Sequence, residues 1–214
     1  MGELLLVRHG QTEWSLSGRH TGLTDIELTD EGERQASQLA SALRRRKISY
    51  AFTSPLLRAK HTAELAGFPD ATPDARLAEW DYGGYEGLTS EQINEPRKGR
   101  QPWSLWAEGV PPGKTPGETV SEVGARVDAF LAEVDLDQGD VVLFGHGHCL
   151  RVLTATWLGL SPSHGSMFAL SPARVSVLGT EHGLAVIRLW NADPGNGVIA
   201  ERGPGGHPTR QHLP

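Results

Sequence analysis

Short apolar runs alternate with longer stretches of helical periodicity in this chain, and this alternation constrains the fold more than any other feature. A strand is predicted over residues 3–7, of which 4–7 are apolar, and residues 141–144 are a second apolar run of strand length, whereas residues 29–47 and 118–134 repeat apolar side chains at helical spacing. Strands joined by crossover helices form parallel sheets with helices on both faces. The sequence therefore predicts an α/β fold: a three-layer sandwich around a mostly parallel central sheet.

Local signals refine two helix starts. Thr29 is a suitable N-cap for the helix over residues 29–47. Ser54 followed by Pro55 predicts a second N-cap and first helical residue, which would place Arg58 in the opening turn. A cation there is unfavourable for the helix dipole, so a bound anion explains it better than stability does.

The rest of the chain divides into recognisable segments. A further strand is predicted over residues 48–52, and an antiparallel edge hairpin turns near His182. The segment 83–117 is rich in Gly and Pro, and we expect it to be a substrate-covering excursion over the sheet edge. We expect a single domain over residues 1–191, followed by a flexible tail or flap over 192–214.

Composition excludes several classes of protein. The 214 residues carry a net charge of −6, which argues against nucleic acid as a partner. The first apolar run, residues 4–7, is too short for a signal peptide or a membrane span. The single cysteine, Cys149, cannot form an internal disulfide, and its place in an apolar helix favours a packing role. We therefore expect a cytoplasmic protein without a membrane partner.

Two of the apolar runs, "LLLVRHG" and "VVLFGHG", end in the same dipeptide, His-Gly. Ligands of open parallel sheets bind beyond the carboxyl ends of the strands, where the loops diverge. If the two strands are neighbours, His9 and His146 meet in one crevice. An isolated histidine at a strand end is usually structural, so the other motifs of the chain decide its interpretation.

Those other motifs occur in order along the chain. They are Arg8-His9-Gly10, Ser54-Pro55 with Arg58-Ala59, Glu79 ahead of Tyr82-Gly83 and Glu86-Gly87, and His146-Gly147 with Leu150-Arg151. Together they resemble the histidine phosphatase superfamily, the phosphoglycerate mutase-like proteins. The resemblance extends from residue 4 to about residue 158.

The resemblance implies a catalytic mechanism. His9 would be the nucleophile that forms a phosphohistidine, and Glu79 would be the general acid and base. Arg8, Arg58 and His146 would form a cationic pocket around the phosphoryl oxygens. The resemblance implies no metal and no cofactor, and it implies a small phosphoester substrate; the family is frequently dimeric, so a homodimer is compatible with it.

The same resemblance implies a phosphate-binding set. Ser15 replaces an asparagine that usually assists phosphate binding in the family, and its hydroxyl would act through water. The residues carried over are Arg8, Ser15, Thr21, Gly22, Arg58, Tyr82, His146 and Gly147.

Departures from the mutase pattern favour the phosphatase branch. The stretch Gly87-Leu88-Thr89-Ser90 lacks the mutase lysine, and only Arg97, Lys98 and Arg100 could replace the paired arginines that grip bisphosphoglycerate. His148 also stands where mutases carry an asparagine. We expect a metal-independent, acid phosphatase-like phosphomonoesterase. The alternative is a 2,3-bisphosphoglycerate-dependent phosphoglycerate mutase.

Two further alternatives belong to other classes. His146 and His148 form a His-x-His pair that His61 or Asp81 could complete as a metal site, but this leaves the arginines without a purpose. The second alternative is a protein that binds phosphoesters but does not turn them over.

The charges predict a pH dependence. Like-charge repulsion from Arg8, Arg58 and His146 should lower the pKa of His9 and keep it a neutral nucleophile. Glu79 must carry a proton when the phosphoester arrives, so turnover should be faster on the acid side of neutrality.

Overall fold

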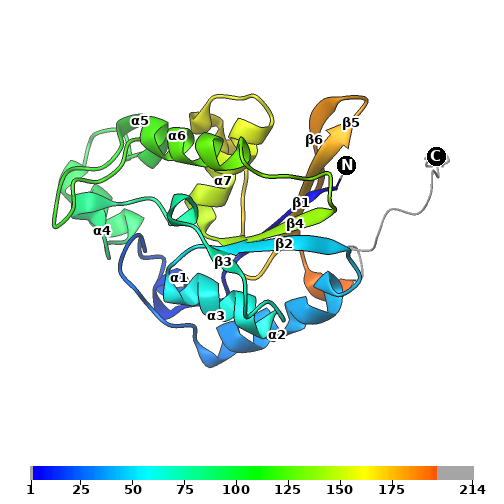
Figure 1. Ribbon diagram of the computed structural model, residues 1–214. Coiled ribbons are helices and arrows are strands. Elements are labelled where there is room, and N and C mark those ends of the chain that lie inside the picture. Colours follow the sequence, from blue (N-terminus) through cyan, green and yellow to red (C-terminus); the bar gives the residue numbers. More distant parts are fainter. Residues whose placement is uncertain (1, 197–214) are drawn as a thin grey trace, which may run out of the picture.

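The computed structural model describes residues 2–196, and its centre is a six-stranded sheet (Figure 1). The strands are β1 (Leu4–Arg8), β2 (Ile48–Thr53), β3 (Thr72–Pro73), β4 (Asp140–Gly145), β5 (Val175–Glu181) and β6 (Leu184–Ala192). Their order across the sheet is β3-β2-β4-β1-β5-β6. The first four strands run parallel, whereas β5 and β6 pair in antiparallel fashion.

Helices cover both faces of this sheet. They are α1 (Glu13–Ser17), α2 (Asp30–Leu43), α3 (Leu57–Leu65), α4 (Ser90–Asn94), α5 (Leu105–Glu108), α6 (Val120–Leu131) and α7 (Gly147–Trp157). Figure 1 shows α6 and α7 on one side of the sheet, with α2 and α3 on the other. The arrangement confirms the predicted α/β class, mostly parallel with an antiparallel edge.

The side chains of β1 explain the two layers. Leu4 and Leu6 join a buried core with α6 and α7, whereas Leu5 and Val7 join a second core with α2 and α3. Alternate residues of a strand point to opposite faces, so a continuous apolar run is the pattern of a strand covered on both sides.

The pairing of β1 with β4 positions the two His-Gly motifs. The strands are parallel and adjacent, and their last paired residues are Arg8 and Gly145. The next residues along each strand are His9 and His146. The backbone N–H of His9 donates to the Gly145 carbonyl at 3.0 Å, which extends the pairing by one residue. Both histidines therefore leave the sheet at the same edge.

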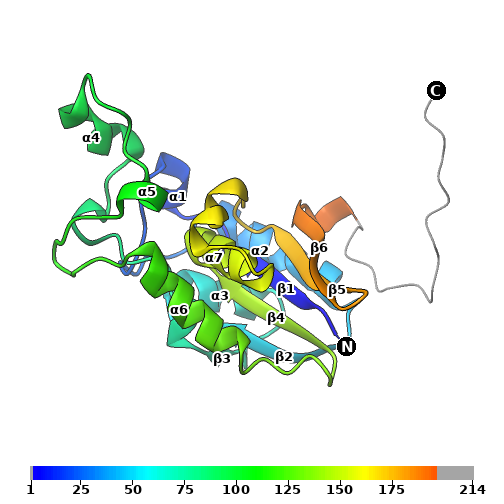
Figure 2. The same cartoon turned by 90° about the horizontal axis from the view of Figure 1, so that it is seen from above.

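The excursion over residues 83–117 lies beyond the ends of the strands, on the side of α1 (Figure 2). Besides α4 and α5 it contains two short 3₁₀ helices, Gly83–Tyr85 and Glu95–Arg97. Trp103 anchors it, because its ring is 9 % exposed and its Nε1 donates to the Gly109 carbonyl. The segment thus lies at the carboxyl end of the parallel strands rather than along an outer strand.

Two helix predictions need adjustment. Thr29 caps α2 as expected, but the helix ends at Leu43, and residues 44–46 form turns instead of its last turn. Ser54 is not a helix cap: the N-cap of α3 is Leu56, and the Ser54 hydroxyl binds a histidine described below. Arg58 still falls in the first turn of α3.

The hairpin and the start of the tail are also defined. His182 and Gly183 adopt positive φ values of 50° and 79°, which confirms the predicted turn between β5 and β6. Ala192 closes β6, and a 3₁₀ turn at Pro194–Asn196 follows, so the fold extends beyond the predicted boundary at residue 191. Most of the predicted tail, residues 197–214, lies outside the described residues.

Candidate active site

The two histidines that follow β1 and β4 come together at the edge of the sheet. The centroids of the His9 and His146 rings are 5.2 Å apart. The side chains of both residues are buried, at 4 % and 0 % exposure. Gly10 lets the chain after β1 pack closely on the start of α2, because a Cβ there would lie 2.4 Å from the Gly32 carbonyl oxygen.

His9 has one ring nitrogen fixed and the other free. Its Nδ1 lies 2.7 Å from the Gly10 carbonyl oxygen, so Nδ1 carries the proton and donates it. Nε2 then carries a lone pair, and it has no hydrogen-bond partner among the described residues. Burial, followed by the charges of Arg58 and Arg8, holds the pKa of His9 well below its ordinary value. The expected direction is thus present, with burial as the larger cause.

His146 differs because both of its ring nitrogens are engaged. Arg58 Nε donates to Nδ1 at 3.2 Å, and Nε2 lies 2.7 Å from the Ser54 hydroxyl oxygen. Because an arginine donates to Nδ1, the proton of the neutral ring is on Nε2. Burial and Arg58 lower the pKa of His146 well below its ordinary value. The expectation of a cationic His146 is therefore corrected: the ring is a neutral imidazole.

Arg58 is fully buried and organises the loop that precedes it in the chain. Its terminal nitrogens donate to the backbone carbonyls of Thr24, Thr21 and Gly22, at 3.0, 3.1 and 2.8 Å. The Gly22 amide is held in turn by the carboxylate of Glu86, at 3.0 Å from each oxygen. Desolvation by burial lowers the pKa of Arg58.

Arg8 supplies a second buried guanidinium. Its NH1 donates to the Leu170 carbonyl, but its Nε is buried and lacks any partner among the described residues. A buried donor without an acceptor is costly, and a bound anion would satisfy it.

The carboxylate of Glu79 lies against the first backbone amides of α7. It accepts from three backbone amides: those of Trp80 at 2.9 Å, His148 at 3.0 Å and Cys149 at 2.8 Å. The sequence alone gave no sign of this placement, because Glu79 is distant from residues 147–157 along the chain. The three donors fix the carboxylate in one orientation at the mouth of the site.

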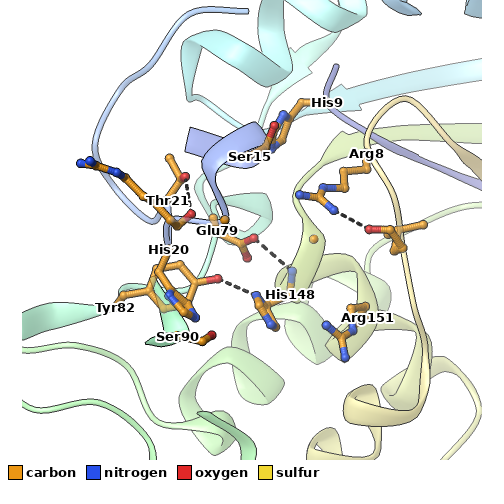
Figure 3. A pocket seen from close by; sticks show the side chains of 14 residues that line it. Arg8, His9, Ser15, His20, Thr21, Glu79, Tyr82, Ser90, His148 and Arg151 are labelled. Carbon is orange, nitrogen blue, oxygen red and sulfur yellow. Dashed lines mark hydrogen bonds between the residues drawn. The ribbon is translucent and has the colours of Figure 1, made fainter. Parts of the chain in front are cut away.

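These residues surround a cleft of about 200 Å³ (Figure 3). Of the predicted site residues, the lining includes Arg8, His9, Ser15, Thr21, Glu79, Tyr82 and Gly147. Gly22, Arg58 and His146 are not part of the lining and form a layer behind it. The lining residues that sequence reasoning missed as site residues are Gly18, Arg19, His20, Ser90, His148, Arg151 and Leu170.

Two of the missed residues carried a sequence signal. His148 and Arg151 follow the second His-Gly motif at helical spacing, so α7 presents them to the same cleft. Arg19 and His20 adjoin Thr21 in the chain. Leu170 and Ser90 enter from distant segments, and no pattern marked them.

The hydroxyl of Ser15 is already engaged within α1. Its Oγ donates to the Thr12 carbonyl and accepts from the Thr12 amide, both at 2.9 Å. Together with the Thr12 side chain these bonds form a capping box. The hydroxyl lines the cleft without a free donor, so it is not a simple replacement for the asparagine amide.

The metal interpretation finds no support in the part of the chain that the structure describes. Within residues 2–196, no three His, Cys, Asp or Glu residues are grouped so that they could hold a metal ion. Asp81 binds Gly83, Thr115 and Gly117, and His61 faces Glu33 at 3.9 Å. Neither residue reaches the cleft lining.

The site geometry agrees with a comparison against protein families. The model of the histidine phosphatase superfamily (branch 1) matches residues 4–193. The chain belongs to this superfamily. It is a phosphatase of this superfamily.

Three relatives place the chain within the superfamily. It is 41 % identical over 193 residues to an acid phosphatase of Mycobacterium tuberculosis, a match that covers 87 % of this chain and 92 % of that protein. It is 38 % identical over 186 residues to a sedoheptulose 1,7-bisphosphatase of Saccharomyces cerevisiae, covering 73 % and 67 %. The solved structure of a Mycobacterium tuberculosis open reading frame product superimposes with a TM-score of 0.83 at 37 % identity, covering 90 % and 98 %.

No helix within residues 2–196 has the length and apolar character needed to span a membrane.

Proposed function

We propose that this histidine phosphatase is a metal-independent phosphomonoesterase, similar to acid phosphatases, that works through a phosphohistidine on His9. The observation that carries the proposal is the state of the His9 ring: Nδ1 is tied to the Gly10 carbonyl, and Nε2 is left without a partner beside Arg8 and Arg58. A buried, neutral imidazole with a free lone pair is a competent nucleophile.

In the first step, His9 Nε2 attacks the phosphorus of the bound ester. The P–O bond to the leaving group breaks as the N–P bond forms, and the proton of Glu79 passes to the leaving oxygen. Arg8 binds the phosphoryl oxygens through its unpartnered Nε, and Arg58 adds positive potential from the layer behind.

In the second step, water hydrolyses the phosphohistidine. Glu79, now a carboxylate, takes one proton from the water as its oxygen bonds to phosphorus, and the N–P bond breaks with its electron pair returning to Nε2. Glu79 ends the cycle protonated, so the net reaction is ester plus water to alcohol plus phosphate. His146 acts as a positioning residue that packs against the nucleophile.

The mutase alternative has less support. Arg97 pairs with Glu108 at 2.8 Å, and Lys98 lies 3.8 Å from Glu95, so these cations already have partners. Neither of them, nor Arg100, belongs to the cleft lining. Because the residues that could replace the paired arginines of a mutase stay outside the cleft, we expect the phosphohistidine to react with water rather than to pass its phosphoryl group to a second substrate.

The proposal is tested by a burst experiment with 4-nitrophenyl phosphate, whose leaving group needs little protonation. In Glu79→Gln we expect a burst of about one nitrophenol per active site, followed by slow turnover, because hydrolysis of the phosphoenzyme lacks its base. After a quench in alkali, which preserves phosphohistidine, the phosphoryl group should be recovered on His9. Chelator should leave wild-type turnover unchanged. Turnover without any phosphoenzyme, or loss of activity with chelator, would refute the mechanism.

The mutase alternative has its own readout. Wild-type protein incubated with 3-phosphoglycerate and 2,3-bisphosphoglycerate should release inorganic phosphate and form no 2-phosphoglycerate. Interconversion of the two monophosphoglycerates that depends on added bisphosphoglycerate would instead establish a mutase.

A further inference from the structure

The arginines that line the cleft carry more positive charge than the neighbouring carboxylates neutralise. Arg8, Arg19 and Arg151 line it, and among the described residues Glu79 is the one carboxylate of the lining. None of the three arginines forms an ion pair with a carboxylate in the described chain. In a protein of net charge −6, such a local concentration of positive charge favours a strongly anionic ligand.

Glu79 divides the charged groups into two sides. Figure 3 shows Arg8 and His9 on one side of Glu79, with His148 and Arg151 on the other. If the phosphoryl group binds beside His9 and Glu79 protonates the bridging oxygen, then His148 and Arg151 face the leaving group. They are three residues apart on α7, which places them on one face of the helix.

Arg151 is held in a defined orientation. Its Nε and NH2 donate to the carbonyls of Gly165 and Ser166 at 2.9 and 3.1 Å, and its guanidinium lies 4.8 Å from the centroid of the Trp106 ring. No described residue binds its NH1. The fixed cation therefore offers one unused donor edge to the cleft.

His148 is held beside it in one tautomer. The Tyr82 hydroxyl lies 2.6 Å from His148 Nδ1. Burial raises the pKa of Tyr82 well above its ordinary value and lowers that of His148 well below its own, so the hydroxyl donates to a neutral ring. The remaining proton is on Nε2, which has no partner among the described residues. The ring also packs against Trp106, with the centroids 5.3 Å apart.

We propose that Arg151 NH1 and His148 Nε2–H form a second anion-binding subsite, which binds a carboxylate or a second phosphate on the leaving group of the substrate. This inference rests on the proposed phosphomonoesterase function and specifies its substrate class: small phosphomonoesters with a second anionic group. Tyr82 is the positioning residue that fixes the donor of His148.

The test compares two substrates that differ at one group. The two molecules differ at the end distal to the phosphoester, which is a carboxylate in 3-phosphoglycerate and a hydroxymethyl group in glycerol 3-phosphate. We expect wild type to have a higher kcat/KM for 3-phosphoglycerate, by about 10- to 100-fold for one charge-assisted contact. Arg151→Gln should reduce this ratio by at least about tenfold, and Arg151→Lys should restore part of it.

A matched control and a second measurement complete the experiment. Arg45→Gln removes an equal charge from an exposed position beyond α2 and should leave the ratio unchanged. If Arg151→Gln does not fold, product inhibition of wild type decides: D-glycerate should compete with substrate, and glycerol should not. A wild-type ratio near one, a ratio unaffected in Arg151→Gln, or equal inhibition by both alcohols would overturn the subsite. Absence of hydrolysis of 4-nitrophenyl phosphate would instead overturn the proposed function.

Discussion

The ends of β1 and β4 present the same dipeptide, His-Gly, yet the two histidines are held in different states. His9 has one nitrogen tied to a backbone carbonyl and one lone pair free, whereas His146 has both nitrogens bound, to Arg58 and Ser54. Both rings are buried and neutral. The neighbours of each imidazole, rather than its place on the fold, decide whether a ring nitrogen keeps a free lone pair, which is what the proposed nucleophile needs.

The largest effect should come from removing the free nitrogen. His9→Ala should lower kcat for 4-nitrophenyl phosphate by about 10⁴-fold or more, because no other described group can take its place as nucleophile. Steady-state kinetics measure the loss of kcat, and the amount of phosphohistidine that survives an alkaline quench measures the loss of the phosphoenzyme. His61→Ala, at a half-exposed imidazole on α3, is the matched control and should behave as wild type. Residual labelling in His9→Ala would show that another residue is phosphorylated.

Removal of the second imidazole should have a smaller effect. His146→Ala removes the acceptor of Arg58 Nε and the imidazole partner of the Ser54 hydroxyl, so we expect kcat to fall about 10²-fold through misplacement of the nucleophile. The phosphohistidine should still form, only more slowly. His146→Gln, which can restore a donor and an acceptor, should recover part of the rate. A loss equal to that of His9→Ala, without any phosphohistidine, would make the two histidines equivalent.

The neutral state of both rings has a consequence for stability. The folded-state pKa values of His9 and His146 are lowered, so below a pH of about 6.5 the unfolded chain binds protons that the folded chain does not. Stability should therefore fall as pH decreases from about 6.5, by up to about 1.4 kcal/mol per pH unit for each histidine. Urea unfolding at pH 7.5 and at pH 5.5 measures the change. Equal stability at both values would show that the buried rings accept protons without cost.

The stability trend opposes the expected activity trend. Turnover should improve on the acid side of neutrality while the fold weakens there, so activity must be measured over short times. His9→Ala should show a smaller pH slope of stability than wild type, because it removes one of the buried rings. An unchanged slope would assign the effect to other groups.

Much of the fold and part of the site could be predicted from local patterns. The apolar run of β1 and the capping signal of Thr29 are properties of a few neighbouring residues. The meeting of His9 with His146 followed from one rule about parallel sheets. What remained hidden depends on side-chain partners contributed by distant segments, such as the amides of α7 around Glu79.

Ser54 illustrates the same limit. Its sequence context predicts a helix cap, but its hydroxyl binds His146, which is 92 positions away in the chain. A three-residue pattern cannot distinguish a local cap from a partner that the sheet brings close. The neutrality of His146 was missed for the same reason, because it depends on burial and on the direction of the Arg58 bond.

The smallest predicted effect concerns that same hydroxyl. Ser54→Ala removes the acceptor of the His146 Nε2–H in a fully buried place, so stability should fall by about 1 to 3 kcal/mol, and kcat by only a few fold. The Arg58 bond to Nδ1 remains and still orients the ring. Ser37→Ala, at an exposed hydroxyl on α2, is the control and should change neither. A loss of activity as large as that of His146→Ala would mean that Ser54, rather than Arg58, holds the imidazole in place.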